Sequence, residues 1–476
     1  MARDYEFVIG GRRVAPERAV EVRSPFSGEV AGRCGDATGL EVERALEAAA
    51  GAREAMAALP AWKRSQALRE LEFAVRENQD ELAELMALEA AKPIRDARAE
   101  VQRGLLTLRT AAEEALRIGG EVAGLDVAAA GEGRTSISRR FPIGVIAGIT
   151  PFNFPLNLVL HKLAPAIASG NPILIKASPR TPLTALRLGE MALGLELPAG
   201  AVNVLAGGAE PARQLCEDGR VAMVSFTGSA AVGWELKARA GRKRVVLELG
   251  GNAANIVHRD ADLELAARRL VAGAFGYAGQ SCISVQRVYA QRAIYDELRQ
   301  RLVAGASALR VGDPADPETE VGPMINDEAA ARAQRWIEEA VAAGATLACG
   351  GKRDGGFVWP TILERVPPAA AIHKEEAFAP VLLLAAYDEP AEALREANAS
   401  RYGLQAGVFT RNIEFALQAH AHLEVGAVLI NEVSSWRMDP MPYGGVKESG
   451  FGREGLRASI EEMTELRLLI LRSGSP

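Results

Sequence analysis

Hydrophobic residues recur at helical spacing through the first quarter of the chain. In residues 40–59 and 65–92 apolar side chains fall at positions i, i+3 and i+4, which places them on one face of an α-helix. From residue 119 to 141 the pattern changes to a glycine-containing stretch with alternating Ser and Arg, which is typical of a hairpin. The pattern therefore predicts a helical layer followed by a short hairpin.

Short apolar runs then alternate with helical patterns. These short runs lie at residues 143–150, 171–177, 202–207, 221–228 and 244–251. Helices are expected between them at 184–195 and 209–218. A second alternating region, from about 254 to 448, has expected strands at 285–291, 360–366, 380–387 and 426–432. Alternation of this kind predicts an α/β protein with a doubly wound parallel sheet covered on both faces.

The end of the chain reads as a helix at 452–463 followed by a lone strand, "TELRLLILRS". An isolated strand presents unpaired backbone groups along its edge. We therefore expect this strand to dock onto another subunit or domain.

Composition narrows the class of protein. The 476 residues have a net charge of 55 − 61 = −6, which gives no electrostatic reason to bind nucleic acid or an anionic membrane. No apolar run approaches the roughly 20 residues that span a bilayer, and the N-terminus has no apolar signal region. The four cysteines form no C-x-x-C pair, so neither a disulfide framework nor a metal site is expected. The sequence predicts a globular protein of two or three domains in a reducing cytoplasm.

A possible phosphate-binding turn follows the expected strand at 221–228. Gly228 permits close approach of the backbone, and Ser229 precedes a helix whose unpaired N–H groups favour an anion. The strict G-x-G-x-x-G pattern is absent, so an ordinary helix capped by Ser229 is an equal or better interpretation of this segment alone.

Three further residues suit chemistry at a carbonyl group. Cys282 follows the small polar residues Gly279–Ser281 and could act as a nucleophile. Glu248 ends an apolar strand, where a raised pKa would suit a general base, although it could be an ordinary solvated residue. The amide of Asn153 could donate to an oxyanion or simply occupy a turn. The five histidines are scattered, so a cysteine–histidine hydrolase has no support.

The order and wording of seven motifs resemble the aldehyde dehydrogenase superfamily over essentially the whole chain. The motifs are PFNFPL, IKASPRTP, SFTGSAAVG, LELGGNAA, GQSC, KEEAFAP and MPYGGVKESGFGREG. The wording is most similar to the group that acts on lactaldehyde, glyceraldehyde phosphate and phosphonoacetaldehyde. The resemblance implies oxidation of an aldehyde to its acid through a thiohemiacetal and a thioester.

The resemblance also assigns the catalytic roles. Cys282 would be the nucleophile, and Asn153 with the N–H of Cys282 would form the oxyanion site. Glu248 would activate the hydrolytic water, and Lys162 would lie near a proton relay from that base. A CoA-acylating enzyme commonly lacks the glutamate, so Glu248 argues against that alternative, and the intact set argues against a non-catalytic protein.

The cofactor implied by the resemblance is NAD or NADP. The expected cofactor-binding residues are Thr150, Phe152, Lys176, Gly228, Ser229, Glu376 and Phe378. Pro179 stands where NAD-preferring members often have a glutamate that bonds the ribose hydroxyls. Because proline cannot accept those bonds and Arg180 follows it, we expect NADP to be accepted, and the sequence leaves the preference between NADP and NAD open.

The substrate positions implied by the resemblance are Leu158, His161, Arg103, Ser281 and Arg437. An arginine recognises carboxylate, phosphate or sulfonate through its planar fork. The alternative is that Arg103 and Arg437 are ion-paired structural residues. Ser281 stands where some phosphate-specific members have a further arginine. These positions predict a small hydroxylated or anionic aldehyde as substrate.

The resemblance divides the chain into three parts. A Rossmann-like NAD(P)-binding domain would comprise residues 1–118 and 142–252, and a catalytic domain would comprise residues 253–448. Residues 119–141 and 449–476 would form an oligomerisation element. A homodimer or homotetramer is expected, with the terminal strand pairing across subunits.

Overall fold

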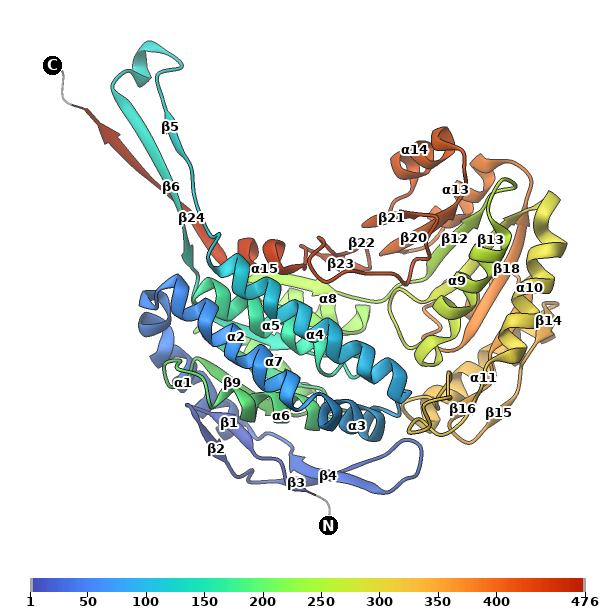
Figure 1. The fold of residues 1–476 in the computed structure, drawn as a ribbon, viewed down its shortest axis with the longest axis horizontal. Helices are drawn as coiled ribbons and strands as arrows, with labels where there is room; N and C mark the ends of the chain where they lie inside the picture. The colour runs from blue at the N-terminus through green and yellow to red at the C-terminus, as the bar shows by residue number, and fades with distance from the viewer. Residues whose placement is uncertain (1–2, 474–476) are drawn as a thin grey trace.

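The computed structural model describes residues 3–473, which form two sheets and a projecting three-stranded arm (Figure 1). The two sheets have largely separate hydrophobic cores. One core draws mainly on residues before Ala253 and on the segment around helix α15 (Leu456–Glu462), and the other draws on residues between Val257 and Val433. The two alternating regions of the sequence therefore correspond to two units of the fold.

The first sheet has eight strands in the order β2-β1-β9-β8-β7-β10-β11-β23. Its parallel centre consists of β7 (Val145–Ile149), β8 (Ile173–Ala177), β9 (Val202–Ala206), β10 (Val221–Thr227) and β11 (Arg244–Glu248). If these five strands are numbered 1 to 5 along the chain, their spatial order in the sheet is 3-2-1-4-5. The direction of winding therefore reverses between β7 and β10. Ligands bind at such a reversal, beyond the carboxyl ends of the strands. The predicted parallel, doubly wound sheet is confirmed.

The edges of the first sheet are antiparallel. The strands β1 (Phe7–Ile9) and β2 (Arg12–Val14) extend it beyond β9, and β23 (Gly450–Phe451) pairs with β11 at the other edge. A separate hairpin of β3 (Ala19–Arg23) and β4 (Val30–Gly35) lies near the N-terminus.

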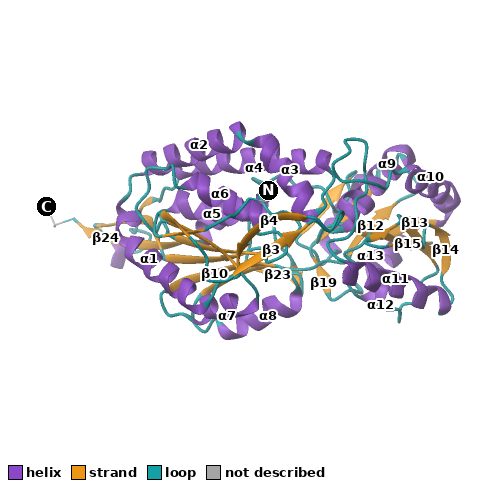
Figure 2. Ribbon diagram, turned by 90° about the horizontal axis from the view of Figure 1, so that it is seen from below, coloured by secondary structure: helices purple, strands orange, loops and turns teal. Residues whose placement is uncertain are grey.

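Helices cover both faces of this sheet, with α5 and α6 on one side and α7 and α8 on the other (Figure 2). The helices of this unit are α1 (Gly39–Ala58), α2 (Ala61–Glu77), α3 (Gln79–Ala90), α4 (Ile94–Ala115), α5 (Asn157–Ser169), α6 (Leu183–Ala192), α7 (Ala209–Glu217) and α8 (Ala230–Arg239). The helical pattern over 65–92 is divided at Asn78, which ends α2 and begins α3.

The second sheet has seven strands in the order β14-β17-β18-β13-β12-β20-β21, all parallel except β14. The strands are β12 (Ala253–Val257), β13 (Val285–Gln291), β14 (Thr346–Cys349), β17 (Thr361–Glu364), β18 (Val381–Tyr387), β20 (Gln405–Phe409) and β21 (Ala427–Ile430). Its helices are α9 (Leu263–Phe275), α10 (Tyr295–Ala308), α11 (Asp327–Ala342), α12 (Ala371–Lys374), α13 (Pro390–Asn398) and α14 (Ile413–His422). Two small ribbons accompany it, β15 (Arg353–Asp354) with β16 (Phe357–Val358) and β19 (Tyr402–Gly403) with β22 (Val446–Lys447).

The arm corrects the expectation of a lone terminal strand. Strand β24 (Thr464–Arg472) pairs along its whole length with β6 (Arg134–Pro142) of the same chain, and β6 also pairs with β5 (Val122–Gly124). The predicted hairpin and the terminal strand thus form one sheet that projects from the body (Figure 1). The preceding part of the predicted oligomerisation element lies elsewhere, because β23 joins the first sheet and α15 packs against α4 and α5.

Among residues 3–473, the helices are all too short or too polar to span a bilayer. The same residues contain no cluster of histidine, cysteine and carboxylate side chains suited to holding a metal ion.

Candidate active site

A cavity of about 990 Å³ opens at the carboxyl ends of β7, β8, β10 and β11, where the two sheet units meet. Every predicted site residue lines this cavity except Lys162 and His161, which are buried in helix α5 behind its wall. The structure therefore gathers residues that are spread from Arg103 to Arg437 in the sequence.

One end of the cavity is formed by the start of helix α8. Ser229 is the N-cap residue, yet within the described chain its side chain makes no capping hydrogen bond. The N–H groups of the first turn are therefore available to an anion, which favours the phosphate-turn interpretation over a serine-capped helix. A Cβ at Gly228 would lie 2.5 Å from the ring of Phe226, so this close turn requires glycine.

Buried polar groups continue this end of the cavity. The Lys176 ammonium donates to the carbonyls of Gly207 at 2.8 Å and Gly208 at 3.3 Å, and its burial lowers its pKa to about 8. The Glu376 carboxylate accepts a hydrogen bond from the N–H of Gly251 at 2.9 Å, and burial raises its pKa to about 7.

Two aromatic rings also line the cavity. Phe152 and Phe378 meet edge to face, with ring centroids 5.8 Å apart, and Thr150 lines the wall beside them. An anion site, a buried cation, a buried carboxylate and an apolar surface along one cavity fit the phosphates, ribose and flat ring of a nicotinamide dinucleotide.

The loop before Cys282 has an unusual backbone. Tyr277, Ala278 and Gly279 have φ values of +48°, +52° and +67°, a left-handed run that side chains rarely adopt. A Cβ at Gly279 would lie 2.1 Å from the carbonyl oxygen of Ala379, so glycine allows the loop to pack on the 376–380 segment. Backbone in sparsely populated conformations is concentrated at functional sites, and here it presents the thiol to the cavity.

The Cys282 sulfur lies 3.2 Å from the hydroxyl oxygen of Tyr443. Burial raises the pKa of the thiol to about 12, and the Tyr443 hydrogen bond opposes that rise. The Asn153 amide donates a hydrogen bond to the backbone carbonyl of Gln280 at 2.9 Å. Gln280 precedes Cys282 by two residues, so this bond ties the amide to the loop that carries the thiol. Nucleophile and amide therefore share one wall of the cavity.

Two buried carboxylates near the thiol differ in their partners. Among the described residues, neither carboxylate oxygen of Glu248 has a hydrogen-bond partner, and burial together with the charge of Glu454 raises its pKa well above the usual range. Burial tends to raise the pKa of Glu454 as well, but this carboxylate accepts a hydrogen bond from the Lys162 ammonium at 2.7 Å. The positive charge of Lys162 outweighs burial and lowers the pKa of Glu454.

An ionic network runs behind the substrate positions. Asp439 accepts two hydrogen bonds from Arg103, at 2.8 and 3.1 Å, and lies 2.9 Å from Nε2 of His161. The other imidazole nitrogen, Nδ1, lies 2.9 Å from an Arg437 nitrogen. If the imidazole is neutral, Nε2 donates to Asp439 and Nδ1 accepts from Arg437, so one tautomer satisfies both contacts. Burial opposes ionisation of Asp439, but His161 and Arg103 lower its pKa.

The two predicted substrate arginines thus differ. Arg103 is a bidentate partner of Asp439, which corresponds to the structural alternative even though the residue lines the cavity. Arg437 stacks on the ring of Tyr443 at 3.6 Å, and its Nη2 lies 3.8 Å from a Glu454 oxygen, but within the described residues its Nε has no hydrogen-bond partner. Leu158 and Ser281 line the same part of the cavity.

Three residues of the site were assigned no role from the sequence. Tyr443 and Glu454 line the cavity, and Asp439 anchors the network behind it. All three lie in the segment "RMDPMPYGGVKESGFGREG", whose wording suggested the family. The sequence signal for Glu454 was its position within a glycine-rich segment. Its role could not be predicted from that segment, because its partner Lys162 comes from another part of the chain.

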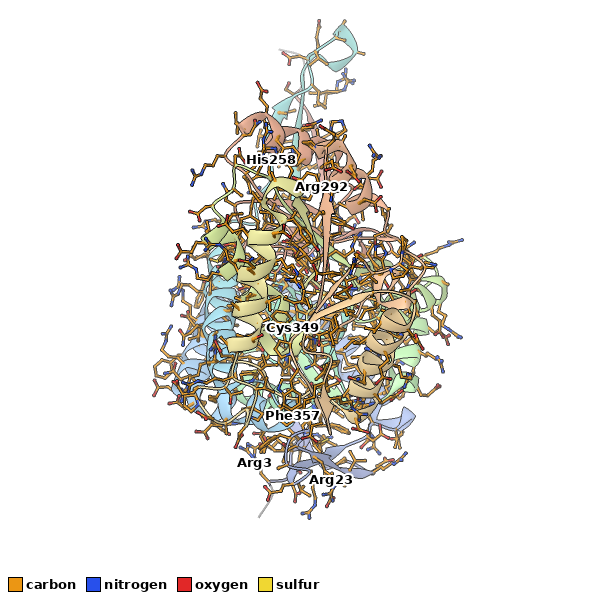
Figure 3. All side chains as sticks on the ribbon, turned by 90° about the vertical axis from the view of Figure 1, so that its right-hand side faces the viewer. Arg3, Arg23, His258, Arg292, Cys349 and Phe357 are labelled. Carbon is orange, nitrogen blue, oxygen red and sulfur yellow. The ribbon has the colours of Figure 1, made fainter. Side chains whose placement is uncertain are left out.

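The remaining histidines and thiols do not supply a thiol–imidazole pair. Figure 3 shows His258 and Cys349 well apart at the outer end of the second unit. His258 is hydrogen-bonded to Asp260, and Cys349 contacts the carbonyl of Pro360. The structure thus adds no support for a cysteine–histidine hydrolase.

Comparison with known proteins places these features in context. Residues 13–469 match the aldehyde dehydrogenase family. The chain is 42% identical over 471 residues to the 3-sulfolactaldehyde dehydrogenase of Priestia megaterium, covering 98% of each chain. It is similar to aldehyde dehydrogenase 21 from Physcomitrella patens in complex with the reaction product succinate, with a TM-score of 0.98, 42% identity and 99% of each chain covered. It is also similar to glyceraldehyde-3-phosphate dehydrogenase GapN from Methanocaldococcus jannaschii complexed with NADP, with a TM-score of 0.92 and 39% identity, covering 95% of this chain and 99% of the other.

Proposed function

The chain belongs to the aldehyde dehydrogenase family, and on that basis we propose that it oxidises a small hydroxylated or anionic aldehyde to the carboxylic acid. The observation that carries the proposal is the meeting of Cys282, Glu248 and Arg437 on one cavity. They offer a nucleophile, a base and an anion-binding group to a single small molecule.

Each residue has a proposed task. The Cys282 thiolate attacks the aldehyde carbon, and the Asn153 amide with the N–H of Cys282 donates to the developing oxyanion. When bound, a nicotinamide cofactor would supply the hydride acceptor, and Cys282 would then hold the acyl group as a thioester. Glu248 takes a proton from the attacking water, so hydrolysis releases the acid and restores the thiol. Lys162 holds Glu454 behind this base, and we propose that the pair lies on its proton path.

The proposed cofactor-binding residues are those of the far end of the cavity. The first turn of α8, including Gly228 and Ser229, would hold phosphate, while Lys176 and Glu376 would bind the riboses. Pro179 and Arg180 are both exposed at this end, and they favour NADP because proline cannot bond the ribose hydroxyls. Comparison of kcat/KM with both cofactors tests this preference, and a hundredfold preference for NAD would contradict it.

The anionic character of the substrate rests on Arg437, whose Nε faces no partner among residues 3–473. Relatives named for sulfolactaldehyde and glyceraldehyde 3-phosphate, and a neighbour holding succinate, act on or bind anionic molecules. Arg437→Ala should raise KM for an anionic aldehyde more than for a neutral aldehyde of equal size. Equal increases for the two aldehydes would contradict an anion-binding role.

The experiment that tests the activity is a panel of small aldehydes assayed by absorbance of the reduced cofactor. Neutral, hydroxylated, phosphorylated and sulfonated aldehydes of similar length would be compared, with Cys282→Ser as the blank. We expect turnover of at least one hydroxylated or anionic member and none by the variant. No turnover of any member would favour a non-catalytic protein. Thioester release only in the presence of CoA would favour the acylating alternative.

We further propose the division into a cofactor domain, a catalytic domain and an oligomerisation element, and a homodimer or homotetramer formed through the arm. The exposed face and edge of β24 are rich in apolar residues: Leu466, Leu468, Leu469, Ile470 and Leu471. Light scattering of the whole chain tests the assembly, and a monomer at micromolar concentration would contradict it. The four free thiols support a cytoplasmic location, which cell fractionation tests.

A further inference from the structure

Tyr443 is placed against the reacting atom of the site. Its hydroxyl oxygen lies 3.2 Å from the Cys282 sulfur, and the residue is only 4% exposed. Either group can be the donor while the thiol is protonated. A thiolate can only accept, so after ionisation the tyrosine hydroxyl must donate.

The ring of Tyr443 is held from two sides. Its backbone exchanges hydrogen bonds with Glu454, at 2.9 Å from its N–H and 2.7 Å to its carbonyl. The guanidinium of Arg437 lies 3.6 Å above the ring centroid and is itself held by His161. A hydroxyl fixed in this way is already oriented toward the sulfur before ionisation, so little ordering is needed when charge appears.

We propose that Tyr443 is a catalytic residue that stabilises the Cys282 thiolate by donating a hydrogen bond to it, with Arg437 as the positioning residue that holds its ring. In this step the S–H bond breaks, the electron pair stays on sulfur, and the proton passes to bulk water. Tyr443 keeps its own proton. The inference rests on the proposed function in treating Cys282 as the nucleophile.

The charges around the thiol show why such a donor is needed. Burial and the carboxylates of Glu376 and Glu248 all raise the pKa of Cys282, while Tyr443 and Arg437 lower it. Burial, with the nearby Cys282 and Glu248, also raises the pKa of Tyr443 well above its usual value, so its hydroxyl stays protonated and able to donate. Of the two groups that lower the pKa of the Cys282 thiol, Tyr443 has the larger effect.

The test is the rate of alkylation of the thiol by iodoacetamide in the full chain, because this reaction requires thiolate but no aldehyde or base. Tyr443→Phe keeps the ring under Arg437 and removes only the hydroxyl. Loss of a charge-assisted hydrogen bond should raise the thiol pKa by about one unit, which is a tenfold loss of thiolate. Because a more basic thiolate is more nucleophilic, the observed rate below the inflexion should fall about threefold to fourfold.

Tyr387→Phe is the matched control, because Tyr387 is also buried in the second unit and donates to the carbonyl of Val257 away from the thiol. It should leave the alkylation rate unchanged. A 3-fluorotyrosine placed at position 443 by codon suppression is a stronger donor and should shift the inflexion to lower pH. Opposite shifts by the two changes at 443 support the proposal, since a merely structural role moves both the same way.

An alkylation profile that is the same in Tyr443→Phe and the unaltered chain would overturn the proposal, as would equal effects of Tyr443→Phe and Tyr387→Phe. If the phenylalanine variant fails to fold, the fluorotyrosine profile decides alone. Absence of turnover on every aldehyde, with a Tyr443-dependent alkylation rate, would remove the proposed function and leave this inference standing.

Discussion

Two groups of side chains at the cavity are both shielded from solvent but are electrostatically opposite. In the reactive region, Cys282 and Glu248 have few partners, and the pKa of each is raised. In the paired network behind it, Glu454 and Asp439 face Lys162, His161 and two arginines, and the pKa of each carboxylate is lowered. Burial alone therefore does not determine ionisation here. The placement of cations determines which groups have a raised pKa and which carboxylates have a lowered pKa and stay charged.

The largest effect on activity is expected from removing the nucleophile of the reactive region. Cys282→Ser should lower kcat for cofactor reduction by roughly 10⁶-fold, the scale seen when a catalytic nucleophile is lost. The thermal unfolding midpoint should hardly change, because serine is nearly isosteric. Cys349→Ser, which alters a thiol outside the cavity, is the matched control and should keep activity within about twofold.

Removing the base should separate the two chemical steps. Glu248→Gln should lower steady-state kcat by roughly 10³-fold, within the range for general bases, yet keep a first-turnover burst of reduced cofactor. Because burial raises the pKa of Glu248, its base form grows as pH rises, and kcat of the unaltered chain should climb with pH through that raised pKa. The variant should lack this limb. Loss of the burst together with kcat would instead place Glu248 before thioester formation.

Breaking the paired network should affect stability more directly. Glu454→Gln leaves the fully buried Lys162 ammonium without its counter-charge and should lower the free energy of unfolding in urea by about 3 kcal/mol. Because the pKa of Glu454 is lowered, its contribution is present above the usual glutamate range and is lost as pH falls toward the lowered value. Glu235→Gln breaks an exposed pair with Arg239 and should leave the free energy of unfolding almost unchanged. Equal losses for the two variants would contradict the distinction.

The smallest expected effect sharpens the contrast between the two arginines. Asp439 neutralises Arg103 through two hydrogen bonds, so Arg103→Gln should raise KM for an anionic aldehyde less than about threefold. Arg437→Gln should raise the same KM about tenfold, the value of one charged hydrogen bond. The reverse order would show that Asp439 leaves Arg103 free enough to bind substrate.

Local pattern carried much of the fold. The short apolar runs at 221–228 and 244–251 contain valines and end in glycine, and this pattern predicted strands. Strands β10 and β11 lie within these two runs. Cys282, Glu248 and Asn153 were recognisable from motif wording and occupy one cavity. Their roles remain predictions, since shared position does not measure chemistry.

Long-range pairing was beyond the pattern. Strand β24 looked isolated because its partner β6 lies some 330 residues earlier in the chain, and the hydrogen bonds that join them leave no periodic trace. Arg103 and Asp439 are 336 positions apart, so the local sequence around either residue does not predict their ion pair. The break at Asn78 was missed because α2 and α3 both continue the same apolar spacing.

The close fit of Gly279 against the backbone of Ala379 has a consequence for divergence. The loop that carries the thiol and the segment that carries Glu376 and Phe378 meet at this contact, where even a methyl group would collide. A substitution that shifts either segment to suit a new aldehyde also displaces the surface proposed to hold the nicotinamide. Lineages changing substrate would therefore find fewer neutral steps here than on the Arg437 side of the cavity, and directed evolution for new aldehydes should accumulate its mutations there first.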